Sequence, residues 1–353
     1  MAVRVVVIGG GVAGCAAAVA AARSGARVQL LEAGHHLGGV AVRGEHRTLC
    51  GLAAIDAPTP DLLEPQLVSD WLPRLTNGLP FRQGRVWLWP TDAQLLQSGL
   101  AKGLAQAGVS SAFGAELRTV RSAQGRIVSV SAAGVDHACD VVIDASGAGV
   151  VGHLLGLPRA TARQWPAHRS LLDVPGLGES RAERVRALTV VQRVSGGDAA
   201  CALTPLEGGR WQLSLDVAPD ASAADGAAIA GRIADALGGT LIACAWRIAE
   251  RDGGRPVSAL DLNELFATRE RGLCWAAWPR EEHGSSGVIW TWPPRDRHGV
   301  PESVARPAGW PTNAWCVGRG IAASAEAASA LRVTGTCLAL GGAVGALASV
   351  DQR

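Results

Sequence analysis

The first 32 residues carry the feature that most constrains the fold, a glycine-rich motif between a predicted strand and a predicted helix. Residues 3–8 (VRVVVI) form a β-branched run that favours a buried parallel strand. Residues 9–14 (GGGVAG) follow, and the alanine-rich residues 15–23 favour a helix. Residues 28–31 (VQLL) predict a second strand, which Glu32 closes. This strand–turn–helix–strand unit is typical of a dinucleotide-binding α/β fold.

The glycines, the helix N-terminus and the acidic residue of this unit each have a physical role in holding a dinucleotide. Gly9 permits the tight turn, Gly11 lets the backbone approach a pyrophosphate, and Gly14 lets the helix lie close to the sheet. The helix N-terminus offers free N–H groups and partial positive charge to the phosphates. Glu32 lies where a carboxylate accepts hydrogen bonds from ribose hydroxyls. The predicted cofactor residues of this unit are Gly9, Gly11, Val12, Ala13, Gly14, Glu32 and Ala33.

A glycine pair after the second strand indicates that the dinucleotide is FAD and not NAD. Gly38 and Gly39 stand six and seven residues after Glu32. This extension resembles the FAD-binding branch of the two-dinucleotide-domain flavoproteins, and it implies that the chain passes close to the FAD diphosphate and ribityl. No second GxGxxG with a strand before it occurs later in the sequence. We therefore expect no built-in NAD(P)H domain.

Two later segments agree with an FAD site. Residues 140–149 (DVVIDASGAG) predict a buried strand that ends in a turn of small residues. Residues 115–120 and 126–131 predict a hairpin that turns at residues 124–125 (QG). The C-terminal residues 315–347 predict a short apolar strand ending in Gly-Arg and then a threonine-capped helix with glycines for close packing.

Together, residues 9–39, 141–147 and 318–346 resemble the FAD-dependent oxidoreductase family. Its sequences run GGGxAGxxAAxxAARxGAxVxLLExxxxLGG at the start, VIDASG or VIDATG in the middle and GRxxSxxxxAxxxxRVxxTCxxLGxAxGxxA at the end. The resemblance implies FAD as the cofactor, a backbone contact to adenine in the hairpin, and a last helix whose N-terminus faces the flavin pyrimidine edge. The residues that it adds to the predicted site are Gly38, Gly39, Leu117, Ala145, Ser146, Gly147, Gly318, Arg319, Gly341 and Gly342.

The predicted fold class is α/β, with a discontinuous Rossmann-like FAD-binding domain and a second, mixed-sheet α+β substrate domain. The FAD-binding domain is expected to comprise residues 1–48, 90–160 and 305–353. The substrate domain is expected to comprise residues 161–304, with 49–89 as an intervening segment.

Within the substrate domain, the pattern predicts strands at residues 187–194, 201–205, 211–217 and 241–248. It predicts a helix at residues 223–237. Residues 275–278 (WAAW) and 288–292 (VIWTW) are expected to form two further strands that face one another.

Composition excludes several functional classes. The chain has 33 basic and 31 acidic residues, a net charge of +2, which argues against a nucleic-acid partner. Eight cysteines without a CxxC predict reduced thiols and no metal site. The uncharged stretches 5–22 and 333–350 are rich in alanine and glycine, so their drive into lipid is weak. Cleaving the first as a signal peptide would discard the strongest motif. We therefore expect a cytoplasmic protein without a membrane partner.

The candidates for catalysis are few. The loop after the glycine pair carries Arg43, His46 and Cys50, and in the family this loop passes near the isoalloxazine ring. His46 is compatible with a general base, a covalent flavin link or a solvated loop residue. Cys50 is compatible with a redox thiol or an inert one, since no second cysteine lies nearby. Arg319 is compatible with a contact to FAD, to a substrate carboxylate or to a structural ion pair.

Clustered tryptophans suggest the character of the substrate. Trp275, Trp278, Trp290 and Trp292 can wall a pocket for an apolar or aromatic small molecule, or they can form the core of a sheet. The expected partner is such a small-molecule substrate, and an electron-acceptor partner remains open. The sequence does not indicate the oligomeric state.

Three functions fit these patterns. The first is hydride transfer between a small molecule and flavin N5 by a dehydrogenase, oxidase or double-bond reductase. The second is a flavin monooxygenase or halogenase, although Gly318-Arg319 replaces the Gly-Asp of aromatic hydroxylases and residues 87–90 (WLWP) only partly match the halogenase WxWxIP. The third is a non-catalytic FAD-binding or electron-transfer subunit, which the short second lobe and the lack of an evident acid–base set favour.

Overall fold

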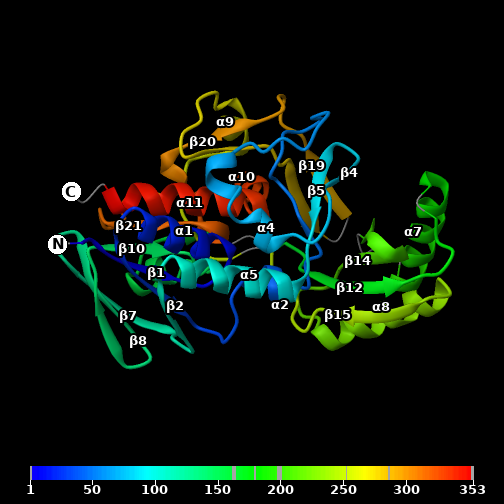
Figure 1. The fold of residues 1–353 in the computed structure, drawn as a ribbon, viewed down its shortest axis with the longest axis horizontal. Helices are drawn as coiled ribbons and strands as arrows, with labels where there is room; N and C mark the ends of the chain where they lie inside the picture. The colour runs from blue at the N-terminus through cyan, green and yellow to red at the C-terminus, as the bar shows by residue number, and fades with distance from the viewer. Residues whose placement is uncertain are drawn as a thin grey trace.

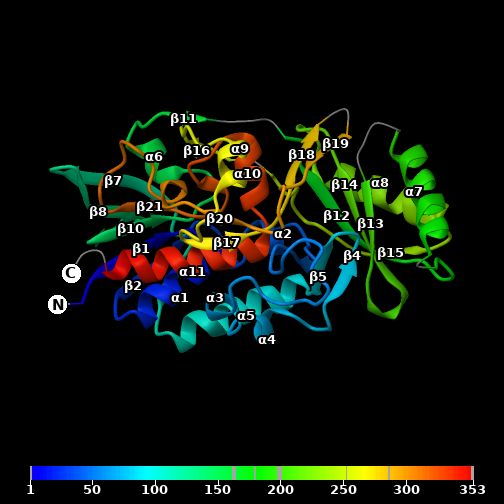
Figure 2. The same ribbon diagram turned by 90° about the horizontal axis from the view of Figure 1, so that it is seen from above.

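The computed structural model describes residues 2–160, 164–178, 180–196, 201–251, 253–284 and 287–350. Figures 1 and 2 show two lobes side by side. The larger lobe contains both termini, and the smaller one lies at the opposite end of the molecule.

The larger lobe is built on a five-stranded sheet in the order β21-β10-β1-β2-β6, and every neighbouring pair in it is parallel. The strands are β1 (Arg4–Ile8), β2 (Arg27–Glu32), β6 (Ser110–Phe113), β10 (Val141–Asp144) and β21 (Ala314–Cys316). Both faces of β1 and β10 are buried, which explains their continuous apolar runs. The strand–helix–strand unit predicted at the N-terminus is present.

Helices α1 (Val12–Arg23) and α11 (Thr334–Val350) lie against one another on one face of this sheet (Figures 1 and 2), and α5 (Ala93–Gln106) packs beside α1. Two glycines of α11 permit the close approach. A Cβ atom at Gly341 would lie 2.2 Å from the carbonyl oxygen of Ala13, and one at Gly345 would lie 2.1 Å from that of Ala17. These positions therefore fix the distance between the two helices.

The other face of the sheet is covered by an antiparallel sheet of β7 (Leu117–Ala123), β8 (Arg126–Ala132) and β9 (Val135–Ala138). Ile127 of this sheet belongs to one hydrophobic cluster with Val142 of β10. The hairpin predicted in this region is confirmed, with Gln124 and Gly125 both at positive φ in the turn.

The smaller lobe is a four-stranded antiparallel sheet in the order β13-β14-β12-β15. Its strands are β12 (Ala167–Asp173), β13 (Cys201–Pro205), β14 (Arg210–Asp216) and β15 (Thr240–Cys244). Helices α7 (Arg181–Ser195) and α8 (Ala223–Ala236) pack on one face, where they bury Trp211 and Leu213 with Leu215. Because side chains alternate along a strand, Gln212 and Ser214 point to the opposite face, toward the larger lobe.

Two predictions about this half of the chain are wrong. Residues 187–194 lie inside helix α7 and not in a strand, since Ser180 caps the helix and Ala187 and Val191, one turn apart, are its buried residues. Residues 274–276 and 287–291 do not pair. Strand β17 (Cys274–Ala276) pairs with β20 (His298–Val300), and β19 (Gly287–Thr291) pairs with β18 (Arg280–Gly284). Both segments contain a strand, but the sequence pattern does not identify the partner of a strand.

The hydrophobic core also places the boundary between the lobes differently from the expectation. Leu265 and Val300, expected in the substrate domain, belong to the same buried cluster as Val7 of β1 and Leu338 of α11. Val68, in the expected intervening segment, joins that cluster too. The second sheet with its two helices therefore spans only residues 167–244, and the segments after it return to the larger lobe.

The remaining elements are short. They are α2 (Val40–Arg43), β3 (Thr48–Leu49), α3 (Pro65–Val68), α4 (Leu72–Leu75), β4 (Phe81–Gln83), β5 (Val86–Pro90), α6 (Val150–Leu154), β11 (Arg159–Ala160), β16 (Arg255–Pro256), α9 (Leu262–Ala267), α10 (Ala325–Leu331) and the 3-10 turns Glu207–Gly209, Glu302–Val304 and Gly318–Gly320. In the described part of the chain, no single helix has the length and hydropathy of a membrane span; α10 and α11 reach that limit only as a pair, bent by 91°.

Candidate active site

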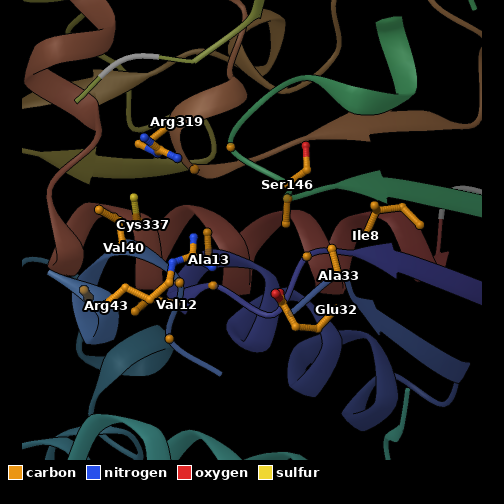
Figure 3. Close-up of a pocket in the computed structure, with 18 of the residues that line it drawn as sticks. Ile8, Val12, Ala13, Glu32, Ala33, Val40, Arg43, Ser146, Arg319 and Cys337 are labelled. Atoms are coloured by element: carbon orange, nitrogen blue, oxygen red, sulfur yellow. The ribbon is translucent and has the colours of Figure 1, made fainter. Parts of the chain in front are cut away.

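A cavity of about 260 Å³ opens at the carboxyl ends of β1, β2 and β10, the edge of a parallel sheet where nucleotides bind. In Figure 3, Glu32 and Ala33 lie at one end of it, Val40, Arg43 and Cys337 lie at the other, and the first turn of α1 lies between them. The cavity is thus elongated along the glycine motif.

The three glycines of the motif have separate tasks. A Cβ atom at Gly11 would meet no atom within 4 Å, so this position leaves open space in the cavity wall. A Cβ atom at Gly9 would lie 2.6 Å from the carbonyl oxygen of Ala145, and one at Gly14 would lie 2.0 Å from that of Gly9. Gly9 and Gly14 are therefore required for packing, and Gly11 provides the room that a diphosphate needs.

The acidic residue at the end of β2 is held rigidly. Glu32 is buried, and its two carboxylate oxygens accept hydrogen bonds from the backbone N–H groups of Gly10 (2.6 Å) and Gly34 (2.8 Å). Leu117 lines the same end of the cavity. This arrangement fits the ribose and adenine end of FAD.

The glycine pair crosses the middle of the cavity. Gly38 and Gly39 have φ values of +92° and +56°, in the left-handed region that favours glycine. Gly38 donates a hydrogen bond to the carbonyl oxygen of Gly10 (2.8 Å) and forms a β-bridge with Gly11. The pair therefore closes the loop beside the motif, where the diphosphate and ribityl would lie.

The small-residue turn after β10 forms the facing wall, and Ala145, Ser146 and Gly147 all line the cavity. The buried carboxylate of Asp144 holds this turn, because it accepts hydrogen bonds from the Ser146 hydroxyl (2.6 Å) and from the backbone N–H of Val151 (2.9 Å). Burial raises the pKa of Asp144.

The C-terminal residues divide into those that line the cavity and those that pack behind it. Gly318, Arg319, Thr334 and Cys337 line it, so the first turn of α11 reaches the end opposite Glu32. Gly341 and Gly342, predicted as cofactor contacts, do not: Gly341 abuts Ala13 of α1, and position 342 faces Leu67 at 3.5 Å. They lie about two turns beyond the helix start, and their small size serves packing.

A second cavity, of about 470 Å³, adjoins the first and lies between the lobes. The two share wall residues: Val40, His46, Arg319, Arg332 and Thr334. The polar face of the smaller lobe forms one wall, through Thr204, Gln212 and Ser214. Trp278, Trp290 and Trp292 form another, as the aromatic-pocket interpretation predicted, whereas Trp275 is not among the lining residues.

His46 stands where the two cavities meet. Burial, together with the positive charges of Arg169 and Arg251, lowers the pKa of His46 well below its ordinary value of 6.5. Its imidazole is therefore neutral at pH 7.

Cys50 lines the second cavity. Burial raises the pKa of Cys50 to about 12, so this thiol is protonated and is a poor nucleophile. Arg43 lines the first cavity only.

A buried network of charges underlies the second cavity, and of its members the sequence pattern points only to Trp278 and His283. The Glu281 carboxylate lies 3.0 Å from Nε2 of His283 and accepts a hydrogen bond from Nε1 of Trp278 (2.9 Å). Nδ1 of His283 lies 2.7 Å from Asp216 Oδ2, and the other Asp216 oxygen is paired with Arg251 (2.7 Å). Burial favours the neutral form of Glu281, but His283 and nearby arginines outweigh it and lower the pKa of Glu281 to about 2.

Arg169 is the other functional candidate that sequence reasoning missed. It lies on β12, between His168 and Ser170, and lines the second cavity. A lone arginine in the segment AHRSLLD was the available signal, but the strand itself had not been recognised.

The chain is similar to a known sequence family and to solved structures. The family model described as FAD dependent oxidoreductase matches residues 4–199 and 258–353. No curated protein gave a significant match. Among solved structures, glycine oxidase from Geobacillus kaustophilus is similar at a TM-score of 0.50 and 14% identity, covering 99% of this chain and 93% of that one.

Two other solved structures are similar at lower TM-scores. A geranylgeranyl bacteriochlorophyll reductase-like protein from Thermoplasma acidophilum matches with a TM-score of 0.49 and 14% identity, covering 99% of this chain and 77% of that one. The p-nitrophenol 4-monooxygenase from Pseudomonas putida matches with a TM-score of 0.42 and 13% identity, covering 68% and 65%. This chain spans only 55% to 65% of the length of several such structures.

The family match and the geometry of the first cavity agree on the cofactor. The matched ranges include the glycine motif, the turn after β10 and the start of α11, which are the segments that line the cavity. The open space at Gly11 and the fixed carboxylate of Glu32 fit the dinucleotide. The chain belongs to the FAD-dependent oxidoreductase family, and FAD is its cofactor.

Proposed function

We propose that the protein transfers a hydride between a small-molecule substrate in the second cavity and flavin N5, as a dehydrogenase, an oxidase or a double-bond reductase. The observation that carries this proposal is the junction of the two cavities at His46, Arg319, Arg332 and Thr334. Glu32 marks the ribose end of the cofactor site. A substrate in the second cavity would face the other end of that site.

When bound, FAD supplies the acceptor or donor of two electrons. This chain's residues would then bind and orient the two reactants. Gly11 leaves room for the diphosphate, and Glu32 would accept hydrogen bonds from the ribose hydroxyls. The start of α11 adds partial positive charge at the opposite end, which favours negative charge there.

His46 supplies the proton transfer in this proposal. Oxidation of an alcohol or amine to a carbonyl or imine removes a hydride from carbon and a proton from oxygen or nitrogen. A neutral imidazole at the cavity junction can accept that proton. Because its pKa is lowered, His46 is available as a base throughout the neutral range.

The test is anaerobic mixing of the FAD-loaded protein with a panel of alcohols, amines and unsaturated acids, with the flavin absorbance followed. The proposal expects reduction by at least one member, slowed about 100-fold or more in His46→Gln, the range typical of a lost general base. The matched control is His36→Gln, an exposed histidine outside both cavities, which should react like the wild type. Reduction by no member of the panel, or equal rates in both variants, would oppose the proposal.

A further inference from the structure

Arg169 differs from the other arginines of the second cavity. Arg85 is paired with Asp56 (2.6 Å), and Arg251 is paired with Asp216 (2.7 Å). Arg319 donates a hydrogen bond to the carbonyl oxygen of Glu250 (2.6 Å), and Arg332 donates hydrogen bonds to the carbonyl oxygens of Arg251 and Glu281. Among the residues that the structure describes, Arg169 has no hydrogen-bond acceptor, and its Nη1 is buried without a partner.

The carboxylates nearest to Arg169 are already engaged. Both oxygens of Glu281 are occupied by His283 and Trp278, and both oxygens of Asp216 are occupied by His283 and Arg251. Burial and the neighbouring Arg251 lower the pKa of Arg169 to about 10, which still leaves it positively charged at pH 7. A cation thus faces the cavity, and one of its nitrogens, Nη1, is buried without an acceptor among the described residues.

Such an arrangement is costly in a folded protein unless a ligand compensates it. A buried polar group that lacks a partner destabilises the fold, and a buried charge does so more strongly. The strand does not need an arginine here, because the neighbouring cavity-facing residues of the sheet are Ser214, Gln212 and Ala202, which are small or neutral. The guanidinium is therefore best explained by something that enters the cavity.

We propose that Arg169 is the anion anchor of the second cavity and binds the carboxylate of a small substrate. A guanidinium presents a planar fork of donors that matches the two oxygens of a carboxylate. The aromatic wall of Trp278, Trp290 and Trp292 would contact the apolar body of the same molecule. The substrate class is then a monocarboxylic acid with an aromatic or aliphatic body. This inference rests on the proposed function only in taking this cavity as the substrate site.

Pairs of probes that differ only in charge test the anchor without turnover. Phenylacetate is compared with phenylacetamide, and indole-3-acetate with indole-3-acetamide, by titration into the FAD-loaded protein. The readouts are tryptophan fluorescence, since three tryptophans line the cavity, and perturbation of the oxidised flavin spectrum. The wild type is expected to prefer the acid about 10- to 100-fold in at least one pair, as for a hydrogen-bonded charge pair.

Two variants separate the anchor from a general effect of charge. Arg169→Met should abolish the preference for the acid, while the affinity for the amide changes less than about threefold. Arg85→Met, which removes a lining arginine already paired with Asp56, should keep the preference. Because Arg169→Met removes a buried cation without a hydrogen-bond partner, its melting temperature should equal or exceed that of the wild type. A purely structural arginine would give a lower one.

The outcomes are decisive for the anchor and separate from those for the reaction. Absence of any acid preference in the wild type, an unchanged preference in Arg169→Met, or a clear fall in its melting temperature would overturn the inference. An acid preference in a protein whose flavin no compound reduces would support the anchor and oppose the proposed reaction. Reduction of the flavin by uncharged compounds alone, without a preference for the acid, would oppose the anchor and support the proposed reaction.

Discussion

The backbone of Gly39 lies directly against that of Gly11: a Cβ atom added at position 39 would be 3.2 Å from the Cα of Gly11, whereas one added at position 11 would meet no atom. The glycine motif and the glycine pair, 28 residues apart, thus meet and together form one wall of the first cavity, a passage elongated along the motif. The passage lies at the N-terminus of α1, where a diphosphate gains the free N–H groups and the helix dipole.

The first prediction concerns that passage. Gly11→Val should abolish FAD binding while the fold persists, because φ of −67° suits valine and its side chain would enter open space that the diphosphate needs. The FAD-to-protein ratio of the purified variant and its far-ultraviolet circular dichroism check this. Gly231→Ala, at a helix glycine that also faces open space, is the control and should bind FAD normally. A folded Gly11→Val protein with full FAD would place the diphosphate elsewhere.

The second prediction concerns the two neighbouring glycines of α11. Gly341→Ala should destabilise the protein by about 1–3 kcal/mol, because the new methyl group would overlap the carbonyl oxygen of Ala13 at 2.2 Å. Gly342→Ala should be neutral or stabilise it by up to about 1 kcal/mol, since its nearest neighbour is Leu67 at 3.5 Å and alanine favours a helix. Denaturant unfolding of both variants measures the difference. Equal effects would mean that α1 and α11 do not pack as described.

The third prediction concerns Glu32. Glu32→Gln should weaken FAD binding and destabilise the protein by about 1–3 kcal/mol, because an amide oxygen can replace only one of the two carboxylate acceptors used by Gly10 and Gly34. Glu116→Gln is the control, since Glu116 also lines the cavity but is exposed and paired at the surface with Arg118. Calorimetric titration of the apoprotein with FAD compares the variants. Similar losses in both would indicate a general charge effect.

The fourth prediction concerns pH. The folded state lowers the pKa of His46 well below 6.5, so the ring stays neutral as the pH falls from 8 through 6.5. The rate of flavin reduction by a substrate that needs a base should therefore be flat across this range and fall only at more acidic pH, where His46 takes up a proton. Stopped-flow rates from pH 5 to 8 test this. A fall centred at pH 6.5 or above would assign the base to a less buried group.

The parts of the site that could be predicted are those that depend on neighbours in the sequence. The turn at Gly9, the approach at Gly11 and the carboxylate at Glu32 belong to one continuous strand–turn–helix–strand unit, whose packing demands leave a local pattern. The small-residue turn after β10 and the hairpin at Gln124 have the same local character.

The parts that could not be predicted depend on which distant segments meet. One network joins Glu281, His283 and Asp216 because β14 and β18 come together in space. No spacing in the sequence predicts this contact. Arg169 is significant only because its guanidinium lacks an acceptor, which is a property of its surroundings. Gly341 and Gly342 illustrate the opposite difficulty, since a small residue suits close packing of helices as well as close approach to a cofactor.

The central claim is that this chain binds FAD in the cavity at the carboxyl ends of β1, β2 and β10. The most direct test is to purify the protein, release its nucleotide by acid precipitation and identify and quantify that nucleotide by chromatography against protein concentration. We expect a yellow supernatant that contains FAD at a molar ratio approaching one, either as purified or after incubation with FAD. A folded protein that releases no flavin and takes up none on reconstitution would contradict it.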